Sequence, residues 1–219
     1  MVPDLRLYAL LDPVVAGGRA LPDLARLVAG SATLVQLRDK LGSTRALVEE
    51  ARALRQVLEP AGVPLLVNDR VDVALAAEAD GVHIGQDDMA PEDARLLLGR
   101  SAIIGLSINT VALAQAAPLE FLDYVAVGGV YATTSKGNTK APIGIAGLRE
   151  IVRTVHARDP DFPICAIAGI NAGNAAAVIA AGADGVAVIS ALSLAPDPAD
   201  AARALRAVVD VALAKRGRT

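Results

Sequence analysis

The chain contains very little of what builds disulfide frameworks or stacks on nucleic-acid bases. Of its 219 residues one is cysteine, Cys165, and none is tryptophan. A single cysteine excludes an intrachain disulfide and is typical of a reducing compartment. Aromatic residues make up 2% of the chain, too few for a series of base-stacking platforms. We therefore expect a cytoplasmic protein that does not bind nucleic acid.

A strong excess of one charge and a long apolar helix are also missing. The net charge of −3 argues against a general polyanion binder. Pro3, Asp4 and Arg6 interrupt the N-terminal apolar run, so we predict no export signal. Residues 162–183 carry no charge, but glycine and asparagine between 169 and 174 divide them into a strand, a loop and a short helix. No membrane association is expected.

What the sequence does contain is a regular alternation of apolar strands and helices. Eight short apolar runs, each followed by a helical pattern, lie at 5–11, 33–37, 64–67, 81–84, 103–106, 124–127, 164–167 and 185–189. Continuous apolar strands between helices predict a parallel sheet covered by helices. Eight such units favour a closed (β/α)8 TIM barrel, one domain over residues 1–219. The alternative is an open doubly wound sheet, but no Gly-x-Gly-x-x-Gly turn follows the first strand.

An internal repeat supports the barrel. The sequence Ala-Asp-Gly-Val occurs at 79–82 and at 183–186, and Asp123 precedes another strand in a similar way. Each aspartate lies between a helix and the next strand, which is the face opposite the active site in such barrels. We assign these aspartates a structural role only.

Active sites of these barrels lie at the carboxyl ends of the strands, where this chain has many polar residues. The candidates are Gln36, Arg38, Lys40, Asn68, Asp69, His83, Gln86, Asp87, Asp88, Ser107, Asn109, Thr110, Thr133, Thr134, Ser135, Lys136, Asn138, Thr139, Lys140, Gly169 and Ser190.

Two of these carboxylates, Asp69 and Asp88, follow neighbouring strands. Like charges on one rim are costly unless something positive lies between them. Mg²⁺ fits that position, because it binds a few protein carboxylates and takes further oxygens from substrate phosphate. The alternative is that both aspartates cap the helices that follow them. The residues alone leave both interpretations open.

The lysines are distributed unevenly. Only four of the 21 basic residues are lysine, and Lys40, Lys136 and Lys140 fall on the predicted active face. A lysine there supplies a compact, mobile charge suited to phosphate. Gly169 and Ser190 follow strands seven and eight, where many barrels bind phosphate through backbone N–H groups, although a glycine there is equally a plain turn residue.

A metal with lysines around it favours electrostatic catalysis of diphosphate departure. No nucleophile paired with a general base is evident. His83 is the histidine near the rim, His156 falls on a helix, and Cys165 lies within a strand, where we expect it to be part of the core.

Several motifs resemble the thiamine-phosphate synthase family. They are Gln36-Leu37-Arg38-Asp39-Lys40, residues 68–88, Ser107, the loop 133–136, residues 168–170 and residues 183–190, in order along nearly the whole chain. Such enzymes join hydroxymethylpyrimidine diphosphate to a thiazole phosphate, which gives thiamine phosphate and diphosphate. The family reaction is dissociative: diphosphate leaves first, and the thiazole nitrogen captures the pyrimidine cation.

The resemblance implies a role for each matching residue. The pyrimidine diphosphate would be held by Gln36, Arg38, Lys40, Asn68, Ser107 and Lys136, of which Arg38, Ser107 and Lys136 would be catalytic. Mg²⁺ would be bound by Asp69 and Asp88. The thiazole phosphate would be bound by Thr133, Thr134, Ser135, Gly169, Ile189 and Ser190.

Two departures from the family pattern stand out. Ala168 occupies a position where glycine is usual, and Asn109 one where histidine is frequent. A related barrel, the thiazole tautomerase, relies on that histidine and needs no diphosphate site, so the intact Arg38, Asp69 and Asp88 argue against it. A phosphometabolite-binding protein without turnover is a further alternative. The sequence leaves the oligomeric state open.

Two lysines of the irregular segment after the sixth strand, residues 128 to about 144, give a first prediction; we call this segment loop six. Lys136→Ala should reduce turnover more than Lys140→Ala, because Lys136 lies in the matching motif and Lys140 lies four residues beyond it. Steady-state rates of the two variants measure the difference. The reverse order would show that the motif assigns this loop wrongly.

Overall fold

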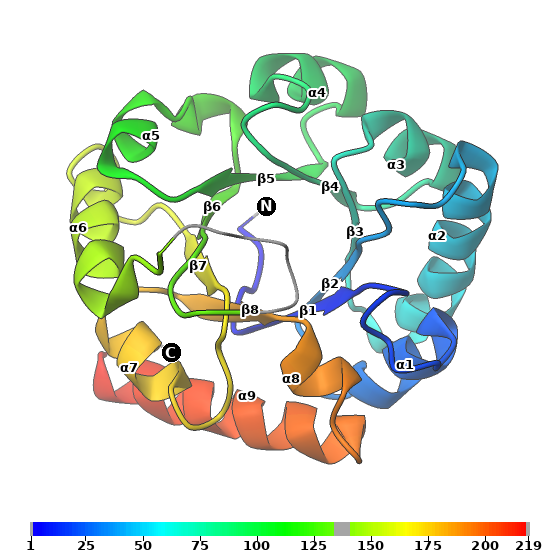
Figure 1. Cartoon of the computed structure of the whole chain (residues 1–219). Helices are drawn as coiled ribbons and strands as arrows, with labels where there is room; N and C mark the ends of the chain where they lie inside the picture. The colour runs from blue at the N-terminus through cyan, green and yellow to red at the C-terminus, as the bar shows by residue number, and fades with distance from the viewer. Residues whose placement is uncertain (1, 134–140, 218–219) are drawn as a thin grey trace.

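A computed structural model describes residues 2–133 and 141–217, and its strands close into a parallel barrel. The strands are β1 (Leu7–Leu11), β2 (Leu34–Leu37), β3 (Leu65–Asn68), β4 (Gly81–Ile84), β5 (Ile103–Ile108), β6 (Tyr124–Val127), β7 (Ile164–Ile167) and β8 (Gly185–Val188). Each strand pairs with the next, and β8 pairs with β1 through Leu7 and Val186. Figure 1 shows this ring with the helices around it. The predicted (β/α)8 barrel is confirmed.

The helices form the outer layer. They are α1 (Leu21–Val28), α2 (Thr44–Leu58), α3 (Val71–Ala77), α4 (Pro91–Leu98), α5 (Val111–Ala116), α6 (Gly144–His156), α7 (Ala175–Ala180), α8 (Ser190–Ser193) and α9 (Pro198–Lys215), with 3₁₀ turns η1 (Glu59–Ala61) and η2 (Leu119–Phe121). Ser43 caps α2 as its residue type suggests, because Ser43 Oγ accepts a hydrogen bond of 3.3 Å from the backbone N–H of Ala46. The short α8 was not predicted, and β5 runs to Ile108, two residues beyond its predicted end.

Two apolar cores hold the barrel together. The larger lies between strands and helices, and the smaller fills the barrel interior with side chains such as Leu10, Leu34 and Leu66. Cys165 belongs to the interior core and is fully buried, as predicted. Burial raises the pKa of this thiol well above its usual range, so the thiolate needed for reactivity is disfavoured.

The repeated aspartates each satisfy a backbone group of a neighbouring strand. Hydrogen bonds run from Leu65 N to Asp80 Oδ2 at 2.8 Å, from Ile104 N to Asp123 Oδ2 at 2.8 Å, and from Ile164 N to Asp184 Oδ2 at 3.0 Å. Two of these carboxylates also form ion pairs, Asp123 with Arg95 and Asp184 with Arg216, each at 2.6 Å. The repeat therefore anchors strand starts at the amino-terminal face.

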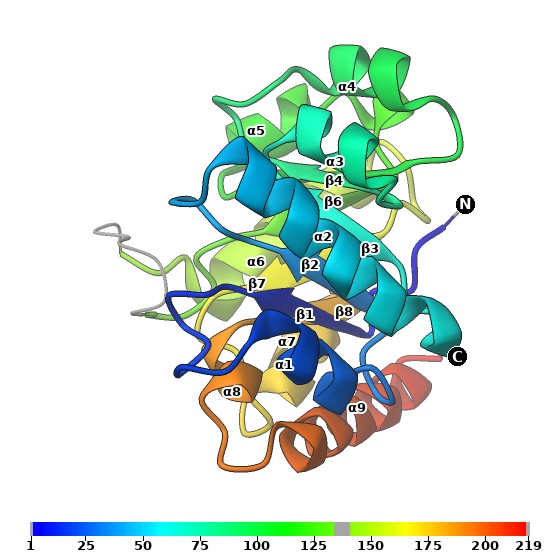
Figure 2. The same ribbon diagram turned by 90° about the vertical axis from the view of Figure 1, so that its right-hand side faces the viewer.

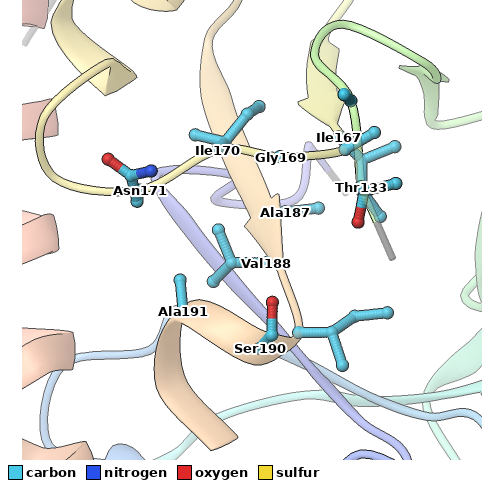
Figure 3. A pocket seen from close by; sticks show the side chains of 12 residues that line it. Thr133, Ile167, Gly169, Ile170, Asn171, Ala187, Val188, Ser190 and Ala191 are labelled. Atoms are coloured by element: carbon cyan, nitrogen blue, oxygen red, sulfur yellow. The ribbon is translucent and has the colours of Figure 1, made fainter. Parts of the chain in front are cut away.

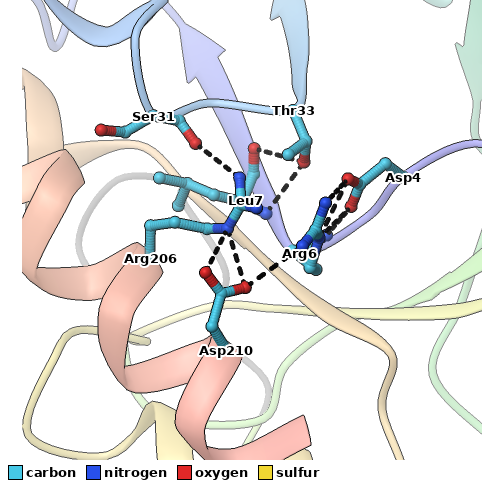
Figure 4. A network of polar contacts seen from close by, with 7 residues as sticks. All are labelled: Asp4, Arg6, Leu7, Ser31, Thr33, Arg206 and Asp210. Atoms are coloured by element: carbon cyan, nitrogen blue, oxygen red, sulfur yellow. Dashed lines mark hydrogen bonds and ion pairs between the residues drawn. The ribbon is translucent and has the colours of Figure 1, made fainter. Parts of the chain in front are cut away.

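A second polar network joins α9 to the loop before β2 (Figure 4). Arg206 donates to the carbonyl of Ser31 at 3.2 Å and pairs with Asp210 at 2.9 Å. The Thr33 hydroxyl accepts from Leu7 N at 3.0 Å, beside the start of β1. The last helix is thereby fixed to the first two strands.

The two ends of the described chain lie at the same end of the barrel, as Figure 2 shows. The uncharged stretch 162–183 is divided between β7, a loop and α7, as predicted. Within residues 2–133 and 141–217, no helix is both long and apolar enough to cross a membrane.

Asp123 provides a test of the anchoring role. Asp123→Ala should lower the free energy of unfolding by about 2–4 kcal/mol, because it leaves the N–H of Ile104 and the largely buried Arg95 without their partner. Chemical denaturation measures the change. The matched control, Asp23→Ala, removes an exposed pair with Arg26 and should cost less than about 1 kcal/mol. Equal losses in both variants would contradict the structural role of Asp123.

Candidate active site

Charged side chains from the loops after β2, β3 and β4 converge at the carboxyl-terminal rim. Asp69 follows β3, and its backbone N–H donates to the carbonyl of His83 at 2.8 Å. Lys40, which follows β2, places Nζ 3.1 Å from Asp69 Oδ2. Asp88, beyond β4, lies within hydrogen-bonding reach of the Asp69 carboxyl group. We call Lys40, Asp69 and Asp88 the charged cluster.

The electrostatics of the charged cluster are unfavourable for two bare carboxylates. Partial burial and the neighbouring Asp69 carboxylate raise the pKa of Asp88, against the lowering effects of the Gly85 N–H and the Lys40 ammonium group. Gly85 N donates to Asp88 Oδ2 at 2.7 Å, which holds that carboxyl group in place. A positive charge between the two aspartates would relieve their repulsion.

The helix-cap interpretation of these aspartates is wrong. Arg70 precedes α3 and Ala90 precedes α4 at the cap positions, and neither helix start has a side-chain cap. Asp69 instead adopts a left-handed backbone conformation with φ 63°, which few residues other than glycine adopt readily. Asp69 pairs with Lys40, and Asp88 lies beside Asp69, as the positions of the two aspartates after neighbouring strands predicted.

The charged cluster can supply only part of a metal coordination sphere. Among the residues that the structure describes, no group of three or more His, Cys, Asp or Glu side chains is placed to hold a metal ion. A hard cation at Asp69 and Asp88 would thus take its remaining oxygens from water or from a ligand, which is common for Mg²⁺.

Arg38 is held by a carboxylate to which the sequence assigned no role. Its guanidinium group forms an ion pair with Asp12, which follows β1 and is 3% exposed. Asp12 Oδ1 also accepts from the backbone N–H of Val14 at 2.9 Å. Because the pair is largely buried, Arg38 is fixed in position at the ends of β1 and β2. The place of Asp12 directly after an apolar strand was the available signal.

A cavity of about 490 Å³ lies at the ends of β7 and β8 (Figure 3). It brings together Thr133, Gly169, Ile189 and Ser190, all predicted site residues. The cavity wall also contains Ile167, Ile170 and Val188, so polar groups sit within an apolar surround. The other predicted residues of loop six lie outside the described residues; they are Thr134, Ser135, Lys136, Asn138, Thr139 and Lys140.

The turn after β7 has an unusual backbone. Ala168 has φ 97° and Gly169 has φ 65°, both in the left-handed region. The Ala168 carbonyl accepts from Tyr131 N at 3.0 Å, which links this turn to the loop after β6. A Cβ atom on Gly169 would lie 2.4 Å from the carbonyl oxygen of Ala132, so only glycine fits there. The left-handed backbone at position 168 explains why glycine is usual there, because glycine adopts this conformation without the steric cost that Ala168 bears.

A chain of buried hydrogen bonds crosses the barrel below the rim. The Gln36 side-chain amide donates to the Tyr8 hydroxyl, and the hydroxyl oxygens of Tyr8 and Tyr124 are 3.0 Å apart. His83 Nδ1 lies 2.8 Å from the Tyr124 hydroxyl, and His83 Nε2 lies 2.8 Å from Ser107 Oγ. Gln36, His83 and Ser107 were predicted as residues of the rim, whereas neither tyrosine was predicted to take part in the site.

Comparison with known proteins identifies the family of the chain. A family model described as thiamine monophosphate synthase matches residues 7–192. The chain belongs to this family. A thiamine-phosphate synthase of Agrobacterium fabrum is 49% identical over 97% of both chains, and one of Moorella thermoacetica is 48% identical over 98% of this chain and all of its own length.

A solved structure supports the same assignment. The thiamine phosphate pyrophosphorylase of Pyrococcus furiosus superposes with a TM-score of 0.83 at 36% identity, covering 96% of this chain and 98% of its own. The resemblance drawn from the motifs is confirmed. Family membership and these relatives make the chain a transferase of thiamine biosynthesis that acts on small molecules.

Ala168 gives a prediction about strain in the site. Ala168→Gly should raise the free energy of unfolding by about 1 kcal/mol, because glycine adopts φ 97° without the steric cost that alanine bears. Chemical denaturation measures the difference. The control is Ala132→Gly, on the neighbouring loop without a left-handed backbone, which should not stabilise the protein. A destabilised Ala168→Gly variant would show that this turn is not strained.

Proposed function

We propose that the chain condenses hydroxymethylpyrimidine diphosphate with a thiazole phosphate and releases thiamine phosphate and diphosphate. The charged cluster is the observation that carries this proposal. It combines a cation with two carboxylates suited to Mg²⁺ and lies on the same rim as the separate cavity after β7 and β8. One rim with two anion-binding regions suits a reaction between two phosphorylated partners.

The pyrimidine diphosphate is assigned to the side of the rim formed by β2 to β5. Its ligands in this proposal are Gln36, Arg38, Lys40, Asn68 and Ser107, together with Lys136 of loop six. Gln36 Oε1 is buried and accepts no hydrogen bond from the described residues. An N–H donor on the pyrimidine would satisfy this oxygen, which otherwise bears a desolvation cost.

Mg²⁺ is assigned to Asp69 and Asp88. Two carboxylates within hydrogen-bonding reach of each other, one with a raised pKa, fit a divalent cation better than they fit water alone. When bound there, Mg²⁺ would neutralise charge on the diphosphate as it leaves. The diphosphate oxygens would complete the coordination that the protein leaves open.

The thiazole phosphate is assigned to the cavity at β7 and β8. Thr133 and Ser190 supply hydroxyl groups, and the turn at Gly169 and the backbone at Ile189 allow close approach of a phosphate. Thr134 and Ser135 extend the same set along loop six. The apolar part of the wall, including Ile167 and Val188, suits the thiazole ring.

The reaction in this proposal proceeds by dissociative displacement. The bond between the pyrimidine methylene carbon and the diphosphate oxygen breaks, and the electron pair leaves with diphosphate. Lys40, Arg38 and Lys136 stabilise the negative charge of the leaving group. The thiazole nitrogen then donates its lone pair to the methylene carbon. The protein contributes proximity and charge, and no covalent enzyme intermediate is needed.

A cytoplasmic location is part of the same proposal. It is supported by the single buried Cys165, which needs no oxidising compartment.

Metal-dependent binding tests the proposal and separates it from the tautomerase alternative. Calorimetry should show that pyrimidine diphosphate binds tightly only with Mg²⁺. Asp69→Asn and Asp88→Asn should each weaken that binding and lower turnover by about 100-fold or more. Asp87→Asn, an exposed neighbour outside the charged cluster, is the matched control and should retain Mg²⁺-dependent binding.

Two results would contradict these assignments. Metal-independent binding of pyrimidine diphosphate would remove the reason for placing Mg²⁺ at Asp69 and Asp88. Tight Mg²⁺-dependent binding without turnover in the presence of thiazole phosphate would instead favour a phosphometabolite-binding protein.

A further inference from the structure

The series of buried hydrogen bonds that joins Gln36, Tyr8, Tyr124, His83 and Ser107 raises the question of where each proton lies. The three middle residues are buried: Tyr8 and Tyr124 are at most 1% exposed, and His83 is 8% exposed. Gly105 of β5 makes room for this arrangement, since a Cβ atom there would lie 2.1 Å from the Tyr124 ring. His83 also stacks on Tyr124, with ring centroids 5.6 Å apart. The geometry is therefore closely constrained by packing.

The direction of the hydrogen bonds follows from counting donors. The Gln36 amide nitrogen only donates, so the Tyr8 oxygen accepts at that end. The two hydroxyl oxygens are 3.0 Å apart, and Tyr124 can donate a hydrogen bond to Tyr8. Because a hydroxyl hydrogen rotates about its C–O bond, Tyr8 can equally be the donor, and the other partners of the two groups decide between these directions. If Tyr124 donated, the buried Tyr8 proton would have no acceptor among the described residues. If Tyr8 donates, the Tyr124 proton is free to bond to His83 Nδ1, and every tyrosine proton has a partner.

The same count extends to Ser107. With Nδ1 accepting from Tyr124, a neutral His83 carries its proton on Nε2. Nε2 lies 2.8 Å from Ser107 Oγ, so the serine oxygen accepts this hydrogen bond. The hydroxyl proton of Ser107 is then left to donate to another group. Burial raises the pKa of both tyrosines, which keeps them protonated as the chain requires.

We propose that Tyr8, Tyr124 and His83 are positioning residues, which hold Ser107 so that its hydroxyl donates a hydrogen bond to the diphosphate of the substrate. The identity of that acceptor rests on the proposed function. A donor aimed at an anion strengthens as charge develops on the leaving group, whereas a hydroxyl that donates to histidine would face the anion with a lone pair. The buried hydrogen bonds thus determine whether the hydroxyl of Ser107 donates a hydrogen bond to the ligand.

If every hydrogen bond of the series ran in the opposite direction, His83 would be the other tautomer. This arrangement requires the Gln36 amide to be turned over, with its oxygen beside Tyr8. His83 would then carry its proton on Nδ1, and Ser107 would donate to Nε2. The two arrangements differ in which imidazole nitrogen is protonated, and this can be observed without any substrate.

Nitrogen-15 NMR of the intact protein with labelled histidine tests the proposal directly. Only His83 and His156 contribute signals from the chain. His156 is an internal reference, because its Nε2 lies 3.2 Å from the carbonyl oxygen of Phe162, which can only accept. His83→Gln assigns the second set of signals by their loss. We expect His83 to show a protonated Nε2 and an unprotonated Nδ1 near neutral pH.

A protonated Nδ1 in His83, with or without a proton on Nε2, would overturn the proposal. Because this readout needs no turnover, it remains valid if the proposed function fails. It also requires no variant of the tyrosines, so a misfolded variant cannot obscure it.

A kinetic cycle tests whether Tyr124 acts through Ser107. Tyr124→Phe should reduce kcat about tenfold, because residues that orient a ligand-binding group commonly have effects of this size. The change in KM should be smaller. In the Ser107→Ala background the same change should alter kcat less than about twofold. Additive losses in the double variant would show that Tyr124 has only a packing role. Thermal unfolding of each variant confirms that folded proteins are compared.

Discussion

Closure of the parallel sheet between β1 and β8 is the constraint on which the site depends. Since all strands run in the same direction, every loop that follows a strand is delivered to one rim. Residues distant in sequence therefore meet there, as Lys40 and Asp69 do. Below the rim, the pairing of β4 with β5 brings His83 to Ser107. The opposite face carries the anchoring aspartates, such as Asp80 and Asp184. Stability and chemistry are thus placed at opposite ends of the barrel.

The second organising feature is the balance of charge at the rim. Asp69 and Asp88 repel each other, and Lys40 compensates only in part, because the pKa of Asp88 is still raised by burial and by its neighbour. Arg38 is paired with Asp12 through one of its guanidinium nitrogens, and this ion pair lowers the cost of its charge in a largely buried position. The proposed Mg²⁺ would relieve the repulsion that remains between the two carboxylates.

The fold and the charged cluster could be read from the sequence because they depend on local pattern and strand order. Apolar runs alternating with helices predicted the eight strands, and positions in the loops after β3 and β4 predicted that the rim carboxylates meet. The Ala-Asp-Gly-Val repeat likewise predicted residues that are structural, as the backbone hydrogen bond of Asp80 shows.

Other features of the site depend on three-dimensional packing, which cannot be predicted from the alternation of apolar runs and helices. Strands of this barrel are apolar on both faces, so alternation did not reveal that Tyr8 and Tyr124 point into the interior. The pairing of Arg38 with Asp12 requires the register of β1 against β2. The left-handed conformation of Ala168 is unfavourable for alanine. It accompanies the hydrogen bond by which the Ala168 carbonyl joins its turn to the loop after β6. The roles assigned to individual site residues remain predictions.

Product formation by the purified protein is the most direct test of the proposed condensation. Diphosphate release and thiamine phosphate formation would be measured with pyrimidine diphosphate and thiazole phosphate, each alone and together, with and without Mg²⁺. Both products should form in equal amounts, and only when both substrates and the metal are present. Folded protein that forms neither product under any of these conditions would contradict the proposed condensation, and the barrel would then need a different chemistry.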